Sequence, residues 1–433
     1  MPKLIVQQGH FERGEIEITK GELLIGRDDD CDIKIPDGQV SRHHAKLIFD
    51  GKKTTLVDLG SYNGSYLNWN PIDEKSDVKH LDVIQIGKNV FVYNEDENVV
   101  EITVDEQDEF KTGEFFTFEF LRNLCSRIEL NVAKVFKGKE DVIRNVLVCM
   151  LADGHILIED RPGVGKSILA QALAKSINGS YKRIQFTPDM LPSDIVGISI
   201  YQDDTKDFKF IPGPIFGNII LADEINRTTP RTQSGLLECM NDAVVTVDGK
   251  SQVLPRPFFV MATQNPSGHQ GTYPLPEAQL DRFLMKINVG YPTPEVELEI
   301  LESQATRHPI NDISYVAYAL DIVKCCALVR KVHVSDAIKD LIIKIVNATR
   351  EHPAVVEGVS PRGSLALMRA SQALAAYYGR RYVMPADIKE IAIPVMSHRI
   401  QMKLRAQSDF VSTDDLVMDI VNSYSDDFKE EDS

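Results

Sequence analysis

Lys166 and Ser167 end a glycine-bearing loop that lies between an apolar run and a helical stretch. Backbone N–H groups of such a loop, at the start of a helix, bind phosphate oxygens. Lys166 would reach the β and γ phosphates of a nucleotide, and the Ser167 hydroxyl would bind Mg²⁺. The sequence therefore predicts a loop that binds ATP, and its cofactor-binding residues are Pro162, Gly163, Val164, Gly165, Lys166, Ser167 and Ile168.

Asp160 stands where the common form of this loop has its first glycine. A carboxylate would repel bound phosphates, so we expect this side chain to point away from the loop. A chance turn that contains Gly165, Lys166 and Ser167 is the alternative that the loop by itself leaves open.

A second group of polar residues follows two further apolar runs. Asp223 and Glu224 come directly after the run 219–222, and Asn265 comes shortly after the run 258–262. Asp223 would bind Mg²⁺ through water, Glu224 would act as the general base on the attacking water, and Asn265 would orient that water. Carboxyl ends of parallel strands meet at one edge of a sheet, where ligands bind. The two groups together predict ATP hydrolysis, against the alternative of an acidic strand end at the surface.

The region 115–294 alternates apolar runs with helical stretches. This alternation predicts an α/β domain in which helices cover a parallel, five-stranded sheet. The expected strands are 155–159, 182–186, 218–222, 257–262 and 284–289. Beyond them, helical periodicity predicts a separate α-helical lid domain over 295–407.

Residues 1–94 are rich in short, alternating apolar runs, which predict an all-β sandwich. Between two of these runs, Asp50-Gly51 predicts a hairpin turn. The expected strands are 23–25, 33–35, 45–49, 55–59, 83–86 and 90–93. Most of the excess negative charge lies in 95–114 and 408–433, which we interpret as an acidic linker and a flexible acidic tail.

The 433 residues carry a formal net charge of −16 and give a pI near 5.1. This balance argues against sequence-independent binding to nucleic acid, because no basic stripe is available to displace counterions. Without an apolar run of roughly 18 residues or a signal-peptide core, we expect a cytoplasmic protein that does not insert into membranes. The six cysteines lack the spacing of metal ligands, so we expect reduced core residues.

Three segments, 223–227, 262–266 and 271–283, resemble signatures of the MoxR branch of the AAA+ ATPases. The resemblance covers residues 115–405, including the phosphate-binding loop. It implies a ring, usually a hexamer, with ATP bound between neighbouring subunits. Arg282 would then be the arginine finger that reaches the γ-phosphate of the adjacent subunit. A surface arginine that caps a helix is the alternative.

Arg362 is similar to the sensor 2 arginine of this family's lid. Ser360 as N-cap and Pro361 at the first helical position would begin the helix that carries it. The sequence leaves open whether Arg362 serves its own subunit or a neighbour. Two stretches, 194–216 and 244–253, resemble insertions whose hairpins face the pore in related rings, with ordinary surface hairpins as the alternative.

The amino-terminal region resembles a forkhead-associated (FHA) domain through Gly26-Arg27, Ser41-Arg42-His43-His44 and Asn63-Gly64. The resemblance implies binding of phosphothreonine. Arg27, Ser41 and Arg42 would bind the phosphate, Asn63 would hold the peptide backbone, and His44 would brace the loops. Tyr62 stands where serine or threonine is common in the family, which puts the affinity for phosphopeptide in question. A sandwich used only for packing is the alternative.

These features favour a chaperone-like ATPase that remodels a client protein and is recruited through phosphothreonine. The MoxR resemblance implies partners with a von Willebrand A domain. A nucleotide-gated scaffold with little turnover is the alternative, although Glu224, Asn265 and Arg282 weigh against it. A motor acting on DNA is disfavoured, since we find no helix-turn-helix pattern and no basic patch.

Overall fold

The structure, a computed structural model, describes residues 3–8, 15–18, 21–38, 40–51, 53–67, 70–72, 74–78, 82–87, 89–94, 117–202, 206–265, 273–304, 309–403 and 412–424. The chain divides into two compact units, Met1–Phe110 and Lys111–Ser433. The linker predicted over 95–114 lies outside the described residues.

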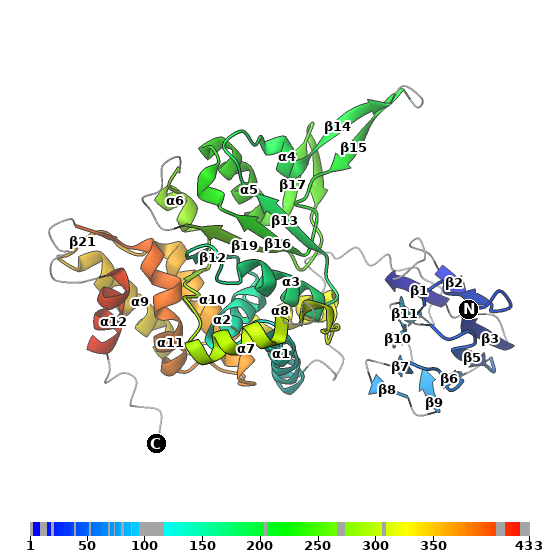
Figure 1. The fold of residues 1–433 in the computed structure, drawn as a ribbon. Helices are drawn as coiled ribbons and strands as arrows, with labels where there is room; N and C mark the ends of the chain where they lie inside the picture. Colours follow the sequence, from blue (N-terminus) through cyan, green and yellow to red (C-terminus); the bar gives the residue numbers. More distant parts are fainter. Residues whose placement is uncertain are drawn as a thin grey trace, which may run out of the picture. The chain divides into compact units, whose positions relative to one another are not determined.

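The amino-terminal unit consists of two stacked β-sheets (Figure 1). One sheet has the order β2 (Glu15–Glu17), β1 (Lys3–Gln8), β11 (Asn89–Asn94), β10 (Val83–Ile86), β7 (Ser65–Leu67) and β8 (Asn70–Pro71). The other has the order β4 (Ile33–Lys34), β3 (Gly21–Gly26), β5 (Ala45–Phe49), β6 (Thr54–Asp58) and β9 (Lys75–Val78). Apolar side chains from both sheets, such as Leu47 and Phe91, are fully buried in one core. The predicted all-β sandwich is confirmed.

The apolar runs predicted as strands in this unit are all strands, and β5 and β6 form the hairpin around Asp50-Gly51. The sequence pattern missed the strands β1, β2, β7, β8 and β9. In β9 the reason is clear, because Val78 is its one buried residue. Backbone pairing with β6, which no side-chain pattern records, holds β9 in the sheet.

The second unit contains a parallel, five-stranded sheet in the order β13 (Tyr181–Gln185), β16 (Ile219–Asp223), β19 (Phe259–Gln264), β12 (Ile156–Glu159) and β20 (Met285–Ile287). These are the five strands that the apolar runs predicted. Ile156 and Ile158 enter the core on one face, whereas Leu157 enters the core on the other. Because both faces are covered, β12 and β16 are apolar except at their last residue, whereas the edge strand β13 has one buried residue, Ile184.

Helices cover both faces of this sheet (Figure 1). On one face lie α1 (Phe118–Ala133), α2 (Glu140–Leu151) and α3 (Lys166–Ser176), whose apolar residues share a core with Ile156. On the other face lie α4 (Pro192–Val196) and α5 (Pro230–Asp242), which share a core with Leu157. Short segments η1 (Ile225–Arg227) and α6 (Glu277–Leu280) connect the strands.

The chain beyond the sheet is mostly helical, and its buried residues join the core formed by α1 and α2. A small antiparallel pair, β21 (Val355–Glu357) and β22 (Gln401–Met402), interrupts it. The helices are α7 (Pro294–Gln304), η2 (Pro309–Asn311), α8 (Ala319–Val329), α9 (Asp336–Glu351), α10 (Pro361–Tyr377), α11 (Pro385–Met396), η3 (Ser397–Arg399) and α12 (Thr413–Ser423).

The flexible tail predicted for 408–433 is wrong for residues 413–423, which form α12. Four apolar side chains of α12 are buried, and the helix packs against α9 and α11. They lie on one face because they recur after one helical turn, and they are Leu416, Val417, Ile420 and Val421. The aspartates that dominated the charge pattern occupy other positions of the helix.

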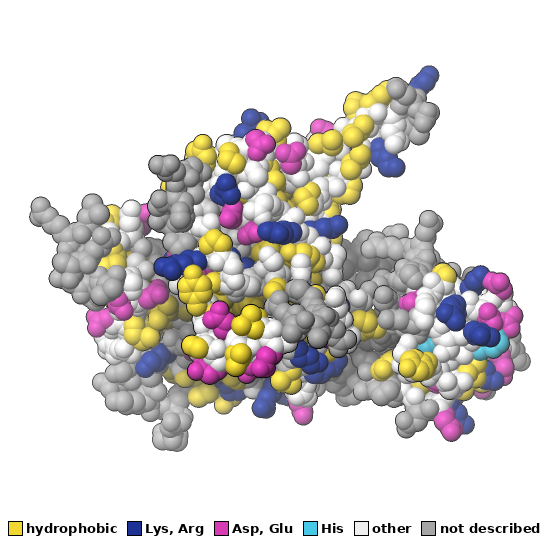
Figure 2. Space-filling model, viewed as in Figure 1, with side chains coloured by type: hydrophobic (Ala, Val, Ile, Leu, Met, Phe, Trp, Pro, Cys, Tyr) yellow, Lys and Arg dark blue, Asp and Glu magenta, His cyan; other side chains and the backbone are white. Residues whose placement is uncertain are grey.

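Two hairpins extend the second unit, at the stretches interpreted as insertions. β14 (Gly197–Gln202) and β15 (Asp207–Pro212) form one, and β17 (Val244–Val247) and β18 (Lys250–Val253) form the other. Figure 2 shows hydrophobic side chains along the first hairpin, which extends away from the sheet. Its exposed apolar residues are Ile198, Ile200, Tyr201, Phe208 and Ile211.

The cysteines, all six of them described, are buried free thiols, as predicted. Burial raises the pKa of the Cys239 thiol to about 11, so it stays protonated near neutral pH. Within the described part of the chain, no helix is both long and apolar enough to cross a lipid bilayer.

Candidate nucleotide and phosphopeptide sites

The predicted phosphate-binding loop connects β12 to the amino end of α3. Gly163 and Gly165 have φ values of 89° and 91°, a region that glycine adopts without strain. Among the described residues, no side chain caps the first turn of α3. Its N–H groups therefore remain available to an anionic ligand, as the predicted role of residues 162–168 requires.

The Lys166 side chain is largely buried within this loop. Its Nζ donates to the carbonyl oxygens of Asp160 at 2.8 Å and Arg161 at 3.3 Å. Desolvation lowers the pKa of Lys166, and the nearby carboxylates of Asp160, Asp223 and Glu224 oppose that shift. An anionic phosphate would offset the same desolvation, so the environment of Lys166 suits a nucleotide.

One oxygen of the Asp160 carboxylate, Oδ2, points toward the segment after β20, whereas Oδ1 accepts from the Arg161 N–H at 2.7 Å. Its Oδ2 accepts hydrogen bonds from the backbone N–H groups of Val289 at 2.8 Å and Gly290 at 2.6 Å. The carboxylate thus fixes the segment after β20 to the loop, and its charge is stabilised by backbone donors.

The candidate metal ligand and base lie at the carboxyl end of β16. Thr263 Oγ1 donates to Asp223 Oδ1 at 2.7 Å and accepts from the Glu224 N–H at 2.8 Å. Asn265 Nδ2 donates to Glu224 Oε1 at 3.1 Å. Glu224 has a φ of 57°, an uncommon backbone conformation held by these contacts. The structure therefore brings together Asp223, Glu224 and Asn265, and the two carboxylates lie near enough to Lys166 to act on its pKa.

Three residues that the sequence analysis missed also contact these carboxylates. Arg183 Nη2 donates to Asp223 Oδ2 at 2.7 Å. Arg227 Nη1 and Gln185 Nε2 donate to Glu224 Oε2 at 2.9 and 3.3 Å. Arg183 and Gln185 belong to β13, whose register places Gln185 beside Asp223. For Arg183 and Gln185 the strand order was the missing information, since alternation by itself does not say which strands are neighbours.

Arg282 lies at the opposite, amino-terminal edge of the sheet, shortly before β20 begins at Met285. Between them, the N–H of Leu284 donates to the carbonyl of His155 at 2.9 Å. The β12–β20 register places Ile156 beside Met285, so Arg282 lies at the edge of the sheet where both strands begin. The phosphate-binding loop and the candidate base instead follow the carboxyl ends of their strands.

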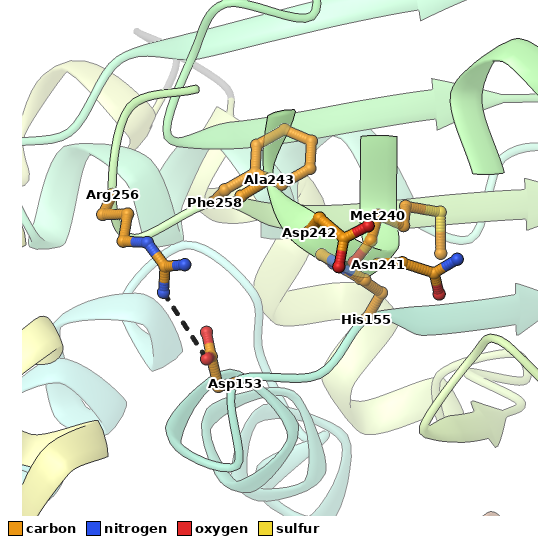
Figure 3. Close-up of a pocket in the computed structure, with 8 residues that line it drawn as sticks. All are labelled: Asp153, His155, Met240, Asn241, Asp242, Ala243, Arg256 and Phe258. Atoms are coloured by element: carbon orange, nitrogen blue, oxygen red, sulfur yellow. Dashed lines mark hydrogen bonds and ion pairs between the residues drawn. The ribbon is translucent and has the colours of Figure 1, made fainter. Parts of the chain in front are cut away.

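Arg362 lies at the same amino-terminal edge as Arg282. Its Nη2 donates to Asn241 Oδ1 at 2.7 Å, near the end of α5. The preceding residue, Met240, accepts a 2.8 Å hydrogen bond from His155 Nε2. Figure 3 shows Asn241 and His155 lining a small pocket at this edge, together with the ion pair between Arg256 and Asp153.

The predicted start of the helix that carries Arg362 is confirmed. Ser360 is the N-cap of α10, its Oγ accepts from the Gly363 N–H at 3.3 Å, and Pro361 is the first helical residue. Arg362 is therefore held in the first turn and is exposed. The sequence correctly placed Arg362 in the first turn of its helix, but it did not show that Arg282 and Arg362 share one edge of the sheet.

In the amino-terminal unit, the candidate phosphate-binding residues come from neighbouring loops. The Arg27 N–H donates to the carbonyls of Ser41 at 3.0 Å and Arg42 at 2.9 Å. Ser41 Oγ accepts from the Tyr62 N–H at 3.1 Å, which ties the loop of Asn63 to the same place. Arg27, Arg42 and Asn63 are exposed, so their side chains are accessible to a peptide.

His44 braces these loops, as predicted, and is fully buried. Its Nδ1 accepts from the Ser41 N–H at 3.1 Å, and its Nε2 donates to the Gly64 carbonyl at 3.1 Å. Burial lowers the pKa of His44, which favours the neutral ring that these two contacts require. The Tyr62 side chain is 94% exposed and therefore adds little to the loop packing.

Comparisons with known proteins agree with both units. Residues 155–285 match the ATPase family associated with various cellular activities (AAA), residues 347–420 match the AAA lid domain, and residues 23–87 match the FHA domain. The chain is 49% identical over 305 residues to YeaC of Bacillus subtilis, covering 70% of this chain and 95% of that protein.

Two further relatives carry informative names. The chain is 39% identical over 295 residues to the chaperone MoxR1 of Mycobacterium tuberculosis, covering 66% of this chain and 78% of that protein. The crystal structure of a putative ATPase from Cytophaga hutchinsonii is similar with a TM-score of 0.66 and 37% identity, covering 70% of this chain and 95% of that one. The chain belongs to the MoxR family of AAA ATPases and has an FHA domain before the ATPase domain.

Proposed function

We propose that this protein hydrolyses ATP at sites shared between neighbouring copies of the chain. The observation that carries the proposal is the placement of the two groups of site residues at opposite edges of one sheet. Lys166 and Glu224 lie at the carboxyl edge, whereas Arg282 and Arg362 lie at the amino edge. One copy therefore cannot bring both groups to one nucleotide, but two adjacent copies can.

Within one copy, each residue at the carboxyl edge has a distinct role. The loop 162–168 binds the phosphates, with Lys166 neutralising charge on the β and γ groups. Glu224 takes the proton from the attacking water, and Asn265 holds the Glu224 carboxylate and orients that water. Arg282 and Arg362 of the adjacent copy would stabilise the negative charge that develops in the transition state.

Ser167 and Asp223 fit a magnesium ion. Both offer oxygen atoms, the ligands that Mg²⁺ prefers, and Asp223 Oδ2 is paired with the cationic Arg183 at 2.7 Å. Binding of Mg²⁺ through water would compete with this arginine for the Asp223 carboxylate. Mg²⁺, when bound, supplies charge neutralisation at the phosphates.

We further propose a ring, with six copies as in related AAA proteins, that remodels a client protein in the cytoplasm. The named chaperone among the relatives supports the remodelling activity, and the shared site requires at least two copies. A protein with a von Willebrand A domain is the proposed partner class, on the family resemblance. The acidic balance of the chain supports a protein client over nucleic acid.

Recruitment of that client would use the FHA domain, which we propose binds phosphothreonine. Ser41 supports this role, because its Oγ accepts from the Tyr62 N–H and its own hydroxyl proton remains available for a phosphate oxygen. The exposed side chains of Arg27 and Arg42 add positive charge, and Asn63 would bind the peptide backbone.

A mixing experiment tests the shared ATPase site. Glu224→Gln and Arg282→Ala chains should each bind ATP but release little phosphate. Mixed together, they should regain hydrolysis, because some interfaces combine an intact Glu224 with an intact Arg282 from the neighbour. Wild-type hydrolysis by Arg282→Ala alone, or no recovery on mixing, would reject the shared site.

Binding of a phosphothreonine peptide tests the FHA assignment. Arg27→Ala should lower the affinity at least about tenfold, because a charge-assisted hydrogen bond contributes roughly 1.5–3 kcal/mol. The unphosphorylated peptide is the matched control and should not bind. Equal affinity of wild type and Arg27→Ala for the phosphorylated peptide would contradict the proposal.

The ion pairs of Asp223 with Arg183 and of Glu224 with Arg227 favour a second candidate function. In that case the chain would be a nucleotide-gated scaffold with little turnover, held at rest by the two arginines. Steady-state phosphate release by the full-length chain separates the candidates. Release that is absent from wild type and appears in Arg183→Gln would favour the scaffold.

A further inference from the structure

We propose that Asp281 and Arg399 are positioning residues that hold Arg282 and Arg362 in one rigid arrangement for the neighbour's nucleotide. The proposal rests on the shared ATPase site proposed above. It adds two residues that do not themselves contact the nucleotide and that lie at the junction of the α6–β20 connection with the lid helices.

Arg399 is bound to the backbone on both sides of Arg282. Its Nη2 donates to the carbonyl of Asp281 at 3.3 Å and to that of Phe283 at 2.5 Å, and its Nη1 donates to that of Leu284 at 3.1 Å. A single guanidinium thus fixes the segment that carries Arg282. His398 Nε2 donates to the same Phe283 carbonyl at 3.0 Å, which adds a second lid contact.

Asp281 connects this guanidinium to the helix that carries Arg362. Its Oδ1 accepts from Arg399 Nε at 2.8 Å, and its Oδ2 accepts from Ser360 Oγ at 3.1 Å. Ser360 is the N-cap of α10, two positions before Arg362. The Asp281 carboxylate therefore links the segment that carries Arg282 to the first turn of α10, which carries Arg362.

Burial makes this arrangement stiff. The Arg399 side chain is 2% exposed and that of Asp281 is 22% exposed. Gly363 allows the close approach, since a Cβ there would lie 3.0 Å from Arg399 Cδ and 2.3 Å from Val359 Cγ1. A buried arginine whose donors are used in a planar fork cannot be replaced by lysine without loss of geometry.

The placement matters because the two arginines act on a nucleotide that another copy holds. A small shift of either side chain would leave ATP binding intact in that copy but would misplace the charge in the transition state. The pair Asp281–Arg399 lies well away from the Lys166 loop, at the other edge of the sheet. A role in positioning and a role in nucleotide binding are therefore separable by experiment.

Arg399→Lys in the full-length chain is the test. We expect the kcat for ATP hydrolysis to fall about 10- to 100-fold, as for a misplacement of roughly 1 Å, with a nearly unchanged KM. Mixing Arg399→Lys with Glu224→Gln should restore hydrolysis above the average of the two separate proteins. Mixing Arg399→Lys with Arg362→Ala should not restore it, since both lack a well-placed arginine for the neighbour.

Arg380→Lys is the matched control. Arg380 pairs with the buried Asp387 in the same set of helices, and its partner lies in the first turn of α11. We expect this variant to lower the melting temperature but not to show the specific fall in kcat that is expected of Arg399→Lys. The Asp281→Leu/Arg399→Met pair, which leaves no buried charge unpaired, should keep the fold while kcat falls.

The results separate this proposal from the shared site. Wild-type kcat in a folded Arg399→Lys protein, or equal loss of kcat in Arg380→Lys, would overturn the positioning role. If Arg282→Ala loses hydrolysis while Arg399→Lys retains it, the shared site stands and the positioning role fails. If Arg282→Ala retains wild-type hydrolysis, the shared site itself fails.

Discussion

Asn265 Nδ2 lies 3.1 Å from Glu224 Oε1, so an amide from the end of β19 holds the carboxylate that follows β16. The two strands are direct neighbours, with Ala222 paired to Ala262. The contact fixes one oxygen of the proposed base, while Arg227 and Gln185 hold the other. The base is therefore oriented by the sheet before any nucleotide enters.

Replacing Asn265 tests this orientation. Asn265→Ala should lower kcat about 100-fold, the usual effect of removing one preorganised donor, while ATP binding persists. Gln264→Ala is a matched control, because its amide contacts Glu159 at 2.9 Å and not the base. Phosphate release and equilibrium binding of a fluorescent ATP analogue measure the two effects. An Asn265→Ala protein as active as the control would contradict the assigned role.

Thr263 should be important for both stability and hydrolysis. Thr263→Val keeps the shape but removes the hydroxyl that binds Asp223 and the Glu224 N–H. An unsatisfied buried donor costs about 1–3 kcal/mol, so the free energy of unfolding should fall by that amount. Thr263→Ser should restore phosphate release and most of the stability. Denaturant titration and phosphate release measure the two effects. If Thr263→Val matched the wild type in both, the hydroxyl would be unimportant.

Tyr62 offers a gain-of-function test in the FHA domain. Its backbone N–H binds Ser41 Oγ, and its side chain is almost fully exposed. Tyr62→Ser would add a hydroxyl donor beside the proposed phosphate position and should tighten phosphothreonine binding about two- to tenfold. Tyr62→Phe, which adds no aliphatic hydroxyl, serves as the control. Fluorescence anisotropy with a labelled phosphopeptide measures both, and equal affinities would argue against phosphate at this position.

His155 and His398 should make the ATPase unit less stable in mild acid. Burial lowers the pKa of both rings below the ordinary value. The folded state therefore keeps them neutral, whereas the unfolded chain takes up protons below about pH 6.5. Stability is complete above that pH and falls as pH decreases toward the lowered values, by up to about 1.4 kcal/mol per pH unit for each ring.

Denaturant unfolding of the full-length chain at several pH values, from roughly 7.5 down to 5, measures this slope. His155 Nδ1 accepts from the Val260 N–H at 3.1 Å, a contact that a protonated ring cannot make. The variants His155→Gln and His398→Gln should each be less stable at neutral pH but show a shallower slope. An unchanged slope in both variants would show that other groups cause the acid sensitivity.

The sequence by itself determined the five strands of the parallel sheet, the loop and the residue types of the sites. Short apolar runs such as 219–222, which alternate with helical stretches, predicted buried strands, and the glycines beside Lys166 predicted a phosphate-binding loop. Ser360-Pro361 set the start of α10 through local capping chemistry, which needs no distant contact. In α12 the same local pattern was present, but its acidic neighbours obscured it.

The tertiary structure decided which of these residues meet. Parallel strands are joined by long connections, so the order β13-β16-β19-β12-β20 cannot be deduced from spacing along the chain. That order brings Arg183 to Asp223, and the strand direction separates Arg282 from Lys166. Asp281 and Arg399, 118 positions apart, form their buried pair because the lid packs against the start of β20. Contacts of this kind depend on packing over long distances in sequence, which local patterns do not encode.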